Sequence, residues 1–176
     1  MTNPLLAQWA TPFDVAPYDQ IEDAHFEPAF EQALEEAKAE ILAISGNDAS
    51  PSFANTIEAV EQAGKALDKV LSVFFSVSGA DTNPKRQELQ RSFSPKLAAY
   101  SSDIYENEAL FARIEALWQD RDSLNLTEEQ QRLLMLTRRG FVRAGAALSG
   151  AAAARMRALR ARLAELGTAF AQSLLA

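Results

Sequence analysis

The apolar residues of this chain recur every three or four positions almost from end to end, which is the spacing of one face of an α-helix. No alternating run of β-branched residues bounded by turns breaks this pattern, so the sequence predicts no strand. The 176 residues suit one domain or one lobe of a larger protein. We therefore expect an all-α fold, a bundle of antiparallel helical hairpins with about six helices.

Proline and glycine divide the chain into segments. Pro4, Pro12 and Pro17 space residues 1–21, for which we expect an irregular N-terminal arm, followed by a helical lobe over residues 22–176. Four apolar residues of the arm are expected to pack on the body of the lobe, namely Leu5, Leu6, Trp9 and Phe13.

Capping residues and helix breakers locate the expected helices within the lobe. Ser50-Pro51 and Asn83-Pro84 each read as an N-cap followed by the first helical residue, and Thr127 with Gln130 forms a capping box. Pro95 falls inside the third pattern, where we expect a kink or a break. The expected helices cover about residues 26–45, 51–79, a stretch from 84 onward, a stretch around 110–118, and 127–142.

The last expected helix runs from residue 150 to residue 176 and carries an apolar stripe on one face. Such a stripe needs a partner, so we expect this chain to be the front part of a larger protein, truncated within its last helix, and able to self-associate through that helix. The stripe consists of Leu159, Leu163, Leu166, Phe170 and Leu174.

Composition and charge exclude several classes of function. The chain has no cysteine, which excludes disulfides and thiolate chemistry, and no apolar run approaches the roughly 20 residues of a membrane span. We expect a soluble, cytoplasmic protein without a membrane partner. Residues 1–61 carry twelve acids and one lysine (net −11), whereas residues 121–176 carry nine arginines and four acids (net +5).

The basic C-terminal end does not predict a nucleic-acid site. On a helix its arginines point in several directions and no aromatic residues interleave with them, so we expect no nucleic-acid partner. These arginines are Arg155, Arg157, Arg160 and Arg162.

His25 is the only histidine of the chain, which excludes a zinc site built from two histidines. Glu22 and His25 have the Glu-x-x-His spacing of half a di-iron site, but the second half is missing. We interpret His25 as a helix-start residue that bonds to nearby backbone. The sequence predicts no catalytic, cofactor-binding or metal-binding residue in this chain.

Other clusters have a functional and a structural interpretation, and the structural one is favoured for each. Acidic residues on the first helix could bind a cation, but a solvated face with Glu35 and Lys38 in contact is favoured. Val73-Phe74-Phe75 could line a ligand pocket, but helical aromatics are more often core. Asp68, Lys69 and Asp81 are interpreted as surface and turn residues. The acidic face consists of Glu31, Glu35, Glu36 and Glu40.

Five segments, in order and spacing, resemble the N-terminal part of the M3 family of zinc oligopeptidases, with its peptidyl-dipeptidases more similar than its oligopeptidases. The resemblance covers nearly the whole chain. The segments are His25-Phe26-Glu27-Pro28-Ala29-Phe30; Asn55-Thr56-Ile57-Glu58-Ala59-Val60-Glu61 followed by Ser72-Val73-Phe74-Phe75; Asp103-Ile104-Tyr105-Glu106-Asn107; Leu110-Phe111-Ala112-Arg113-Ile114; and Phe141-Val142-Arg143-Ala144-Gly145-Ala146.

This resemblance implies a role in a larger enzyme. Family members are helical metallopeptidases that hydrolyse short peptides, and their zinc ligands lie beyond this segment, in the C-terminal catalytic part that would be its partner. Their N-terminal helices form one wall of the substrate channel. On this reading the chain alone is not an enzyme, and the full-length protein carries the zinc. Candidate contacts to peptide are Tyr100, Tyr105 and the arginines from Arg138 to Arg143.

A second hypothesis remains beside the family reading. The chain could be a stand-alone all-α interaction module without enzymatic activity, which would bury its last helix in a defined dimer.

Overall fold

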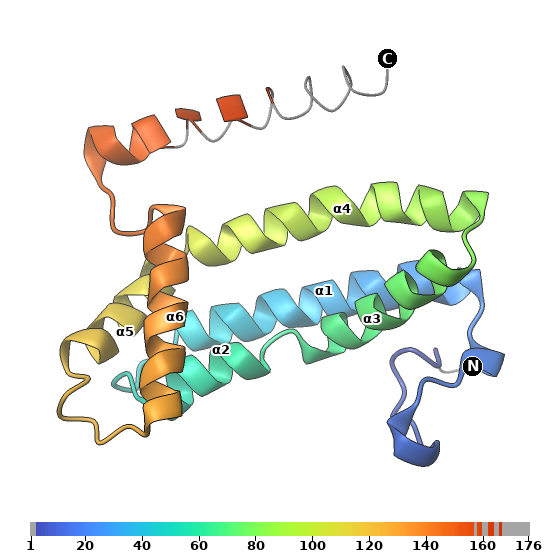
Figure 1. Cartoon of the computed structure of the whole chain (residues 1–176), viewed down its shortest axis with the longest axis horizontal. Helices are drawn as coiled ribbons and strands as arrows, with labels where there is room; N and C mark the ends of the chain where they lie inside the picture. Colours follow the sequence, from blue (N-terminus) through green and yellow to red (C-terminus); the bar gives the residue numbers. More distant parts are fainter. Residues whose placement is uncertain (1–2, 157, 160–161, 164–165, 167–176) are drawn as a thin grey trace.

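The structure is a computed structural model and describes residues 3–156, 158–159, 162–163 and 166 (Figure 1). The described residues form helices and no strand, which confirms the all-α prediction. Three helices make one layer with α1 in the middle, and two further helices pair at one end of that layer (Figure 1). The layer consists of α1 (Asp23–Ser45), α3 (Lys65–Ala80) and α4 (Pro84–Tyr105), and the pair consists of α5 (Glu108–Gln119) and α6 (Glu128–Ala144).

Two hydrophobic cores stabilise this arrangement, and α1 contributes to both. The first lies between α1, α3 and α4, where Phe30 stacks on Phe93 at 3.9 Å and Phe26 meets Phe74 edge-on at 5.2 Å. The second joins Ile41 at the end of α1 to α5 and α6. An apolar stripe on α1 is buried along the whole length of the helix: Phe26, Phe30, Leu34, Ile41 and Ile44.

The expected second helix, residues 51–79, is wrong as a single element. It begins at Ser52 rather than Ser50, because the Ser52 hydroxyl accepts from the Asn55 N–H (3.1 Å) and the Asn55 side chain accepts from the Ser52 N–H (2.8 Å). Its first turns are a π-helical segment, η3 (Phe53–Glu58), which continues into the short α2 (Ala59–Gln62). The chain then breaks at Ala63 and Gly64 before α3 begins.

A contact from α1 holds this break. Gly64 has the left-handed φ of 79°, and its N–H donates to the Glu40 carboxylate at 2.7 Å. That bond satisfies a backbone donor at the start of α3 and places a negative charge where the helix dipole favours it. The break therefore comes from tertiary structure, which helical periodicity does not report.

Gly64→Ala is expected to lower the free energy of unfolding by about 1–2 kcal/mol, because a side chain at positive φ is strained. The nearest atom to an added Cβ is the Tyr100 hydroxyl at 3.6 Å, so crowding adds little. Chemical denaturation followed by circular dichroism measures the change. Gly79→Ala is the matched control: nothing lies within 4 Å of its added Cβ, and alanine favours the helix. Equal effects of both substitutions would contradict the prediction.

The expected break at Pro95 is also wrong, because α4 is one continuous helix from Pro84 to Tyr105. The nitrogen of Pro95 has no hydrogen to donate to the Arg91 carbonyl. Pro95 and Arg91 are both exposed, so water can bond to that carbonyl instead. The start of α4 confirms the prediction that Asn83 is its N-cap, since the Asn83 side chain accepts from the Arg86 N–H at 2.9 Å.

The expected capping box of the fifth helix is confirmed. The Thr127 hydroxyl accepts from the Gln130 N–H (3.2 Å), and the Gln130 side chain accepts from the Thr127 N–H (3.0 Å). This helix, α6, ends at Ala144, two residues later than expected, and Gly145 follows it in the left-handed conformation.

The arm packs on the first core, with one exception. It contains two short 3₁₀ turns, η1 (Pro12–Asp14) and η2 (Tyr18–Gln20). Leu5 is buried and Leu6 and Trp9 are partly buried against this core, as expected. The expected packing of Phe13 is wrong, because its side chain is 98% exposed. Its φ of 59° is a left-handed value that costs a non-glycine residue about 1–2 kcal/mol.

The last helix begins at residue 150, and its described residues are helical. Leu159, Leu163 and Leu166 are half or more exposed there. Phe170 and Leu174 of the expected stripe, and the arginines Arg157 and Arg160, lie outside the described residues. None of the helices in the described part of the chain is both long and apolar enough to span a bilayer.

Candidate functional site

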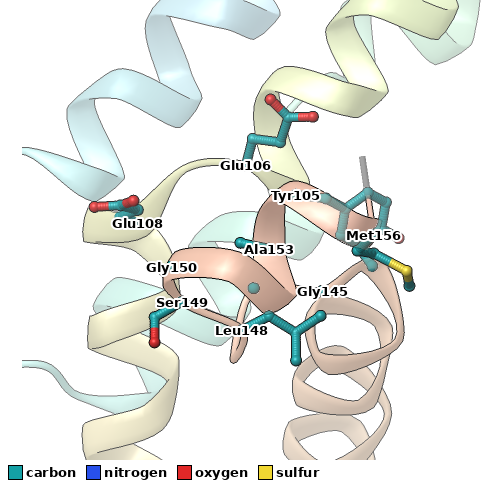
Figure 2. A pocket seen from close by; sticks show the side chains of 11 residues that line it. Tyr105, Glu106, Glu108, Gly145, Leu148, Ser149, Gly150, Ala153 and Met156 are labelled. Carbon is teal, nitrogen blue, oxygen red and sulfur yellow. The ribbon is translucent and has the colours of Figure 1, made fainter. Parts of the chain in front are cut away.

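A cleft of about 470 Å³ lies where the end of α4, the start of α5 and the chain after α6 meet (Figure 2). Tyr105 lines it and packs edge-on against Phe141 at 5.1 Å. The Tyr105 ring also lies on the backbone of Gly140, where an added Cβ would approach the ring to 3.4 Å. The other lining residues are Glu106, Glu108, Ala144, Gly145, Ala146, Leu148, Ser149, Gly150, Ala153 and Met156.

The eleven lining residues place no acid–base pair and no activated nucleophile in the described part of the cleft. Figure 2 shows the Glu106 and Glu108 carboxylates pointing in different directions, so they do not form an acid–base pair across a common substrate atom. The Ser149 hydroxyl has no histidine or lysine beside it among the eleven lining residues, so nothing there would activate it as a nucleophile. The cleft can accept an apolar or small polar group from another chain.

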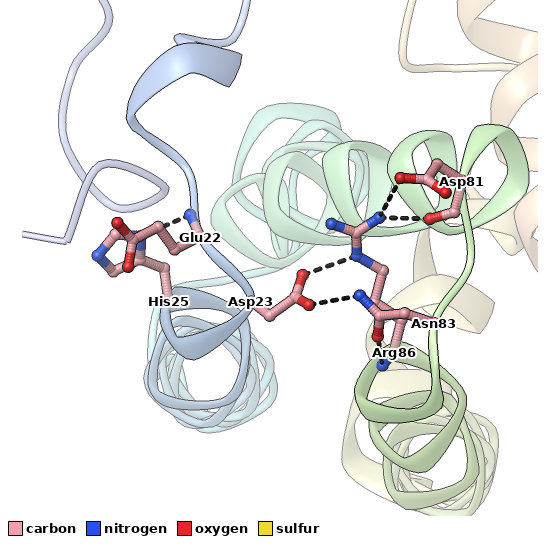
Figure 3. Close-up of polar contacts among 6 residues, drawn as sticks. All are labelled: Glu22, Asp23, His25, Asp81, Asn83 and Arg86. Carbon is pink, nitrogen blue, oxygen red and sulfur yellow. Dashed lines mark hydrogen bonds and ion pairs between the residues drawn. The ribbon is translucent and has the colours of Figure 1, made fainter.

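His25 lies in the first turn of α1, at the other end of the layer (Figures 1 and 3). Its Nδ1 accepts from the Glu22 N–H at 3.0 Å, which confirms the interpretation of His25 as a helix-start residue bonded to backbone. The length of α4 separates this histidine from the cleft, since α4 begins beside Asp23 and ends at Tyr105; 22 helical residues span about 33 Å. The two features cannot act on one substrate atom.

Next to His25, a polar network joins the starts of α1 and α4 (Figure 3). Asp23 accepts from Arg86 Nε and from Asn83 Nδ2, both at 2.7 Å. Arg86 also bonds to Asp81, which follows α3. The position of Asp81 agrees with its interpretation as a turn residue.

The network holds the pKa of Asp23 below its ordinary value of 3.8. Burial alone would raise that pKa, but the hydrogen bonds from Asn83 and Arg86, with the Arg86 charge, outweigh burial. The carboxylate is therefore more stable in the folded state than in the unfolded chain. Its contribution to stability is complete above the ordinary pKa and is lost as the pH falls through the lower, folded pKa.

Asp23→Asn is expected to lower the free energy of unfolding at pH 7 by about 1–2 kcal/mol, because Arg86 loses its charged acceptor. The variant should also lose less stability than the wild type when the pH falls from about 4 to about 2, because it lacks the carboxylate that is protonated there. Urea denaturation over a pH series measures both effects. Glu88→Gln is the control, since Glu88 forms only an exposed pair with Lys85. An unchanged acid slope in Asp23→Asn would contradict the assignment.

Every member of the acidic face has a partner within the fold. Glu35 pairs with Lys38 at 2.7 Å, which confirms the favoured interpretation. Glu40 accepts from the Gly64 N–H, as described above. The remaining contacts are Glu31 with Lys96 of α4 and Glu36 with Gln32. No group of three or more histidine or acidic side chains placed to hold a metal ion is found within the described part of the chain.

Val73, Phe74 and Lys69 lie on α3 and were each given a structural interpretation. Val73 and Phe74 are buried, which confirms the core interpretation, although Phe75 is 44% exposed. The interpretation of Lys69 as a surface residue is wrong. Its ammonium donates to the Ala7 carbonyl at 2.6 Å and lies 4.1 Å from the Trp9 ring centre, so it fastens the arm to α3. Partial burial lowers the pKa of Lys69.

The candidate substrate contacts are dispersed. Arg138 bonds to both oxygens of Glu115 (2.7 and 3.2 Å) and lies over Trp118, so its guanidinium is already engaged. Tyr100 is half-buried between the two cores, and burial, followed by the charges of Glu40 and Asp68, raises its pKa. Of these candidates Tyr105 lines the cleft, while Arg139 and Arg143 are exposed on α6.

Sequence reasoning missed Arg113, a buried cation on α5. Its Nη1 donates to the carbonyls of Asn47 (2.6 Å) and Ala49 (3.1 Å), and its Nη2 donates to the Asn55 side chain at 2.9 Å. The available signal was its position three residues after Leu110, on the apolar stripe of that helix. Arg113 holds the loop between α1 and η3 against α5.

The segments that carry the family resemblance meet one another in the fold. The segment at 25–30 meets the segment at 72–75 through Phe26 and Phe74. The segment at 55–61 meets the one at 110–114 through Asn55 and Arg113. The segments at 103–107 and 141–146 meet beside the cleft through their rings. The resembling segments therefore supply internal contacts of this fold.

Known proteins match the chain over nearly its whole length, although no protein-family model matches it. It is 45% identical over 175 residues to dipeptidyl carboxypeptidase of Salmonella typhimurium and 44% identical over 174 residues to the enzyme of that name from Escherichia coli. It is 25% identical over 175 residues to oligopeptidase A of Salmonella typhimurium.

Each match covers 99% of this chain but only 25–26% of the relative, so the chain spans about a quarter of the length of these proteins. The matching quarter is the N-terminal one. The chain thus fits the N-terminal segment of an M3 peptidase, and its identity to the dipeptidyl carboxypeptidases is higher than its identity to oligopeptidase A.

Proposed function

We propose that this chain is the non-catalytic N-terminal segment of a metallopeptidase that hydrolyses short peptides, and that it forms part of the wall of the substrate channel. The observation that carries the proposal is the 45% identity, over 99% of the chain, to a protein named dipeptidyl carboxypeptidase. The partner of the segment is the C-terminal catalytic part of the same protein. We place the protein in the cytoplasm, where a chain without cysteine is at no disadvantage.

The side chains of this segment do not fit the zinc ion that the family implies. Structural and catalytic zinc sites use cysteine, histidine and carboxylate ligands, commonly with two or more of the first two types. The chain has no cysteine, and the Nδ1 of its one histidine is occupied by the Glu22 N–H. We therefore assign zinc binding and the hydrolytic step to the remainder of the peptidase.

The shape of the segment supports a role as a wall. Three helices form one layer (Figure 1), and the cleft opens beside Tyr105 at the end of α4 (Figure 2). A preformed cleft with an aromatic rim can hold a side chain or backbone stretch of an extended peptide. The segment would select which peptides enter while chemistry takes place elsewhere.

The purified chain alone is expected to release no dipeptides from short peptides and to bind no stoichiometric zinc. Peptide hydrolysis followed by mass spectrometry, together with metal analysis of the purified protein, measures both. One tightly held zinc ion per chain, or hydrolysis by the chain alone, would contradict the prediction.

A graft tests the positive half of the proposal. The 176 residues replace the matching quarter of the Salmonella dipeptidyl carboxypeptidase, and the chimaera is expected to release C-terminal dipeptides. The same relative without its N-terminal quarter is the control and should be inactive. A folded but inactive chimaera would count against the wall assignment.

The alternative, a stand-alone interaction module, rests on the exposure of Leu159, Leu163 and Leu166. Under this hypothesis the chain forms a defined dimer, which Leu163→Glu dissociates by placing a charge in the apolar stripe. Light scattering on both forms decides the question. A monomer for both the wild type and the variant would rule out the module.

A further inference from the structure

We propose that Phe13 is an apolar anchor through which the arm docks onto the C-terminal part of a family-length peptidase. The proposal rests on the proposed function, because its partner is the part of the peptidase that lies outside this segment. It starts from the one arm residue whose expected packing on the segment is wrong.

Phe13 is the most exposed large apolar side chain described in the structure, at 98%. Two further apolar side chains of the same loop region are about half exposed, Val15 at 51% and Tyr18 at 49%. Single exposed apolar residues are ordinary, but these three fall within six residues of sequence, and groups of exposed apolar side chains mark interaction sites.

The backbone beneath Phe13 is strained. Phe13 and the next residue, Asp14, both have left-handed φ values, 59° and 52°. Bulky residues rarely adopt this conformation, and glycine would adopt it without strain. Within the segment no packing energy offsets this strain, because the Phe13 ring buries almost no surface there. Strain of this kind persists where the residue is needed for another contact.

The loop presents the ring on a fixed base. The Thr11 hydroxyl donates to the Val15 carbonyl, and the Asp14 N–H donates to the Thr11 carbonyl at 3.1 Å. Ala16, directly after the loop, is buried in the first core. On the other side of the loop, Trp9 is held by Lys69. A preorganised aromatic side chain on a rigid base loses little entropy on binding, which is typical of interface anchors.

The remainder of the peptidase is the occupant that the observations favour. About three quarters of each dipeptidyl carboxypeptidase lies outside the match, so in those proteins the matching segment is covalently linked to a much larger remainder. A second copy of the arm fits less well. Residues 1–61 carry a net charge of −11, and Asp14 and Asp19 are sequence neighbours of the exposed apolar residues, so two such surfaces would repel each other.

The absence of cysteine gives a direct test, because Val15→Cys introduces a unique thiol into the segment beside an intact Phe13 ring, at a position that is 51% exposed. Its rate of reaction with a maleimide is measured in the isolated chain and in the Salmonella chimaera, with peptide mapping to assign the label. We expect labelling at least tenfold slower in the chimaera. Labelling of the same thiol in the urea-unfolded chain gives its intrinsic reaction rate. A second chimaera, made with the Escherichia coli relative, repeats the comparison.

Phe13→Gly separates docking from folding. In the isolated chain it should leave the melting temperature unchanged or raise it, because it relieves strain and loses almost no buried surface. In the chimaera it should lower the melting temperature, because the anchor is gone. A fall in the isolated chain would show that the ring serves the segment itself and would overturn the proposal.

Three other labelling results would overturn the proposal. The first is equal labelling in the isolated chain and the chimaera. The second is protection that grows with the concentration of the isolated chain, which assigns the ring to a second copy, and the third is protection that requires added peptide, which assigns the ring to substrate. An active chimaera with a reactive thiol rejects docking but keeps the proposed function. An inactive chimaera with a protected thiol keeps docking but rejects the role as part of the channel wall.

Discussion

Replacing Phe74 by alanine is expected to lower the free energy of unfolding by about 3–5 kcal/mol, the largest effect that we expect from a single substitution in this chain. The Phe74 ring is fully buried and lies 5.2 Å from the ring of Phe26 and 5.1 Å from that of Phe93. It therefore joins α3 to both other helices of the layer. Truncation leaves a cavity that all three helices border.

Urea denaturation followed by circular dichroism measures this loss, and the next residue supplies the control. Phe75 is the same residue type on the same helix but is 44% exposed, so Phe75→Ala should cost about 1 kcal/mol or less. If the two substitutions cost the same, the first core is not centred where the structure places it.

Arg113→Met is expected to lower the free energy of unfolding by about 3 kcal/mol, because it removes the donor from three acceptors at once. Methionine keeps the volume and the apolar stem, so the loss reports the hydrogen bonds rather than a cavity. Native-state hydrogen exchange should show faster opening of residues 46–52, the loop that Arg113 holds.

Two variants complete this experiment. Arg113→Lys should recover only part of the loss, since one ammonium cannot reproduce the forked geometry that reaches Asn47, Ala49 and Asn55. Arg139→Met changes an exposed arginine of α6 and should leave stability within about 0.5 kcal/mol. An Arg113→Met protein as stable as the wild type would show that water replaces these bonds.

Local signals predicted the parts of the fold that local interactions determine. The buried stripe of α1 follows from spacing alone, and the caps at Asn83 and Thr127 follow from side chains that bond within one turn. The prediction of one continuous helix through Gly64 and the prediction of a break at Pro95 failed for opposite reasons. A distant carboxylate stabilises the break at Gly64, whereas Pro95 is placed on an exposed part of α4, where the helix tolerates it.

The arm shows where pattern reasoning stops. Leu5, Trp9 and Phe13 look alike in sequence, yet the first is buried, the second is partly buried under Lys69, and the third is exposed. Which apolar residue meets a neighbour depends on the path of an irregular chain, and composition does not encode that path.

One histidine and no cysteine predict a segment without catalytic residues of its own, and this stays a prediction. The cleft itself was not predictable, because residues 105–108 and 144–156 form it together and neither stretch has a local signal for concavity. The role of Arg113 was not predictable from local sequence, because its three acceptors, on Asn47, Ala49 and Asn55, lie about 60 residues earlier in the chain.

The passage of α1 through both cores constrains how such a segment can be exchanged between proteins. A piece that starts after α1 would lose Phe26 and Phe30 from one core and Ile41 and Ile44 from the other. Neither half of the segment is therefore an independent module. Recombination between related peptidases would preserve folding only at junctions outside the stretch that begins with α1 and ends with α6, so this stretch should be inherited as a block.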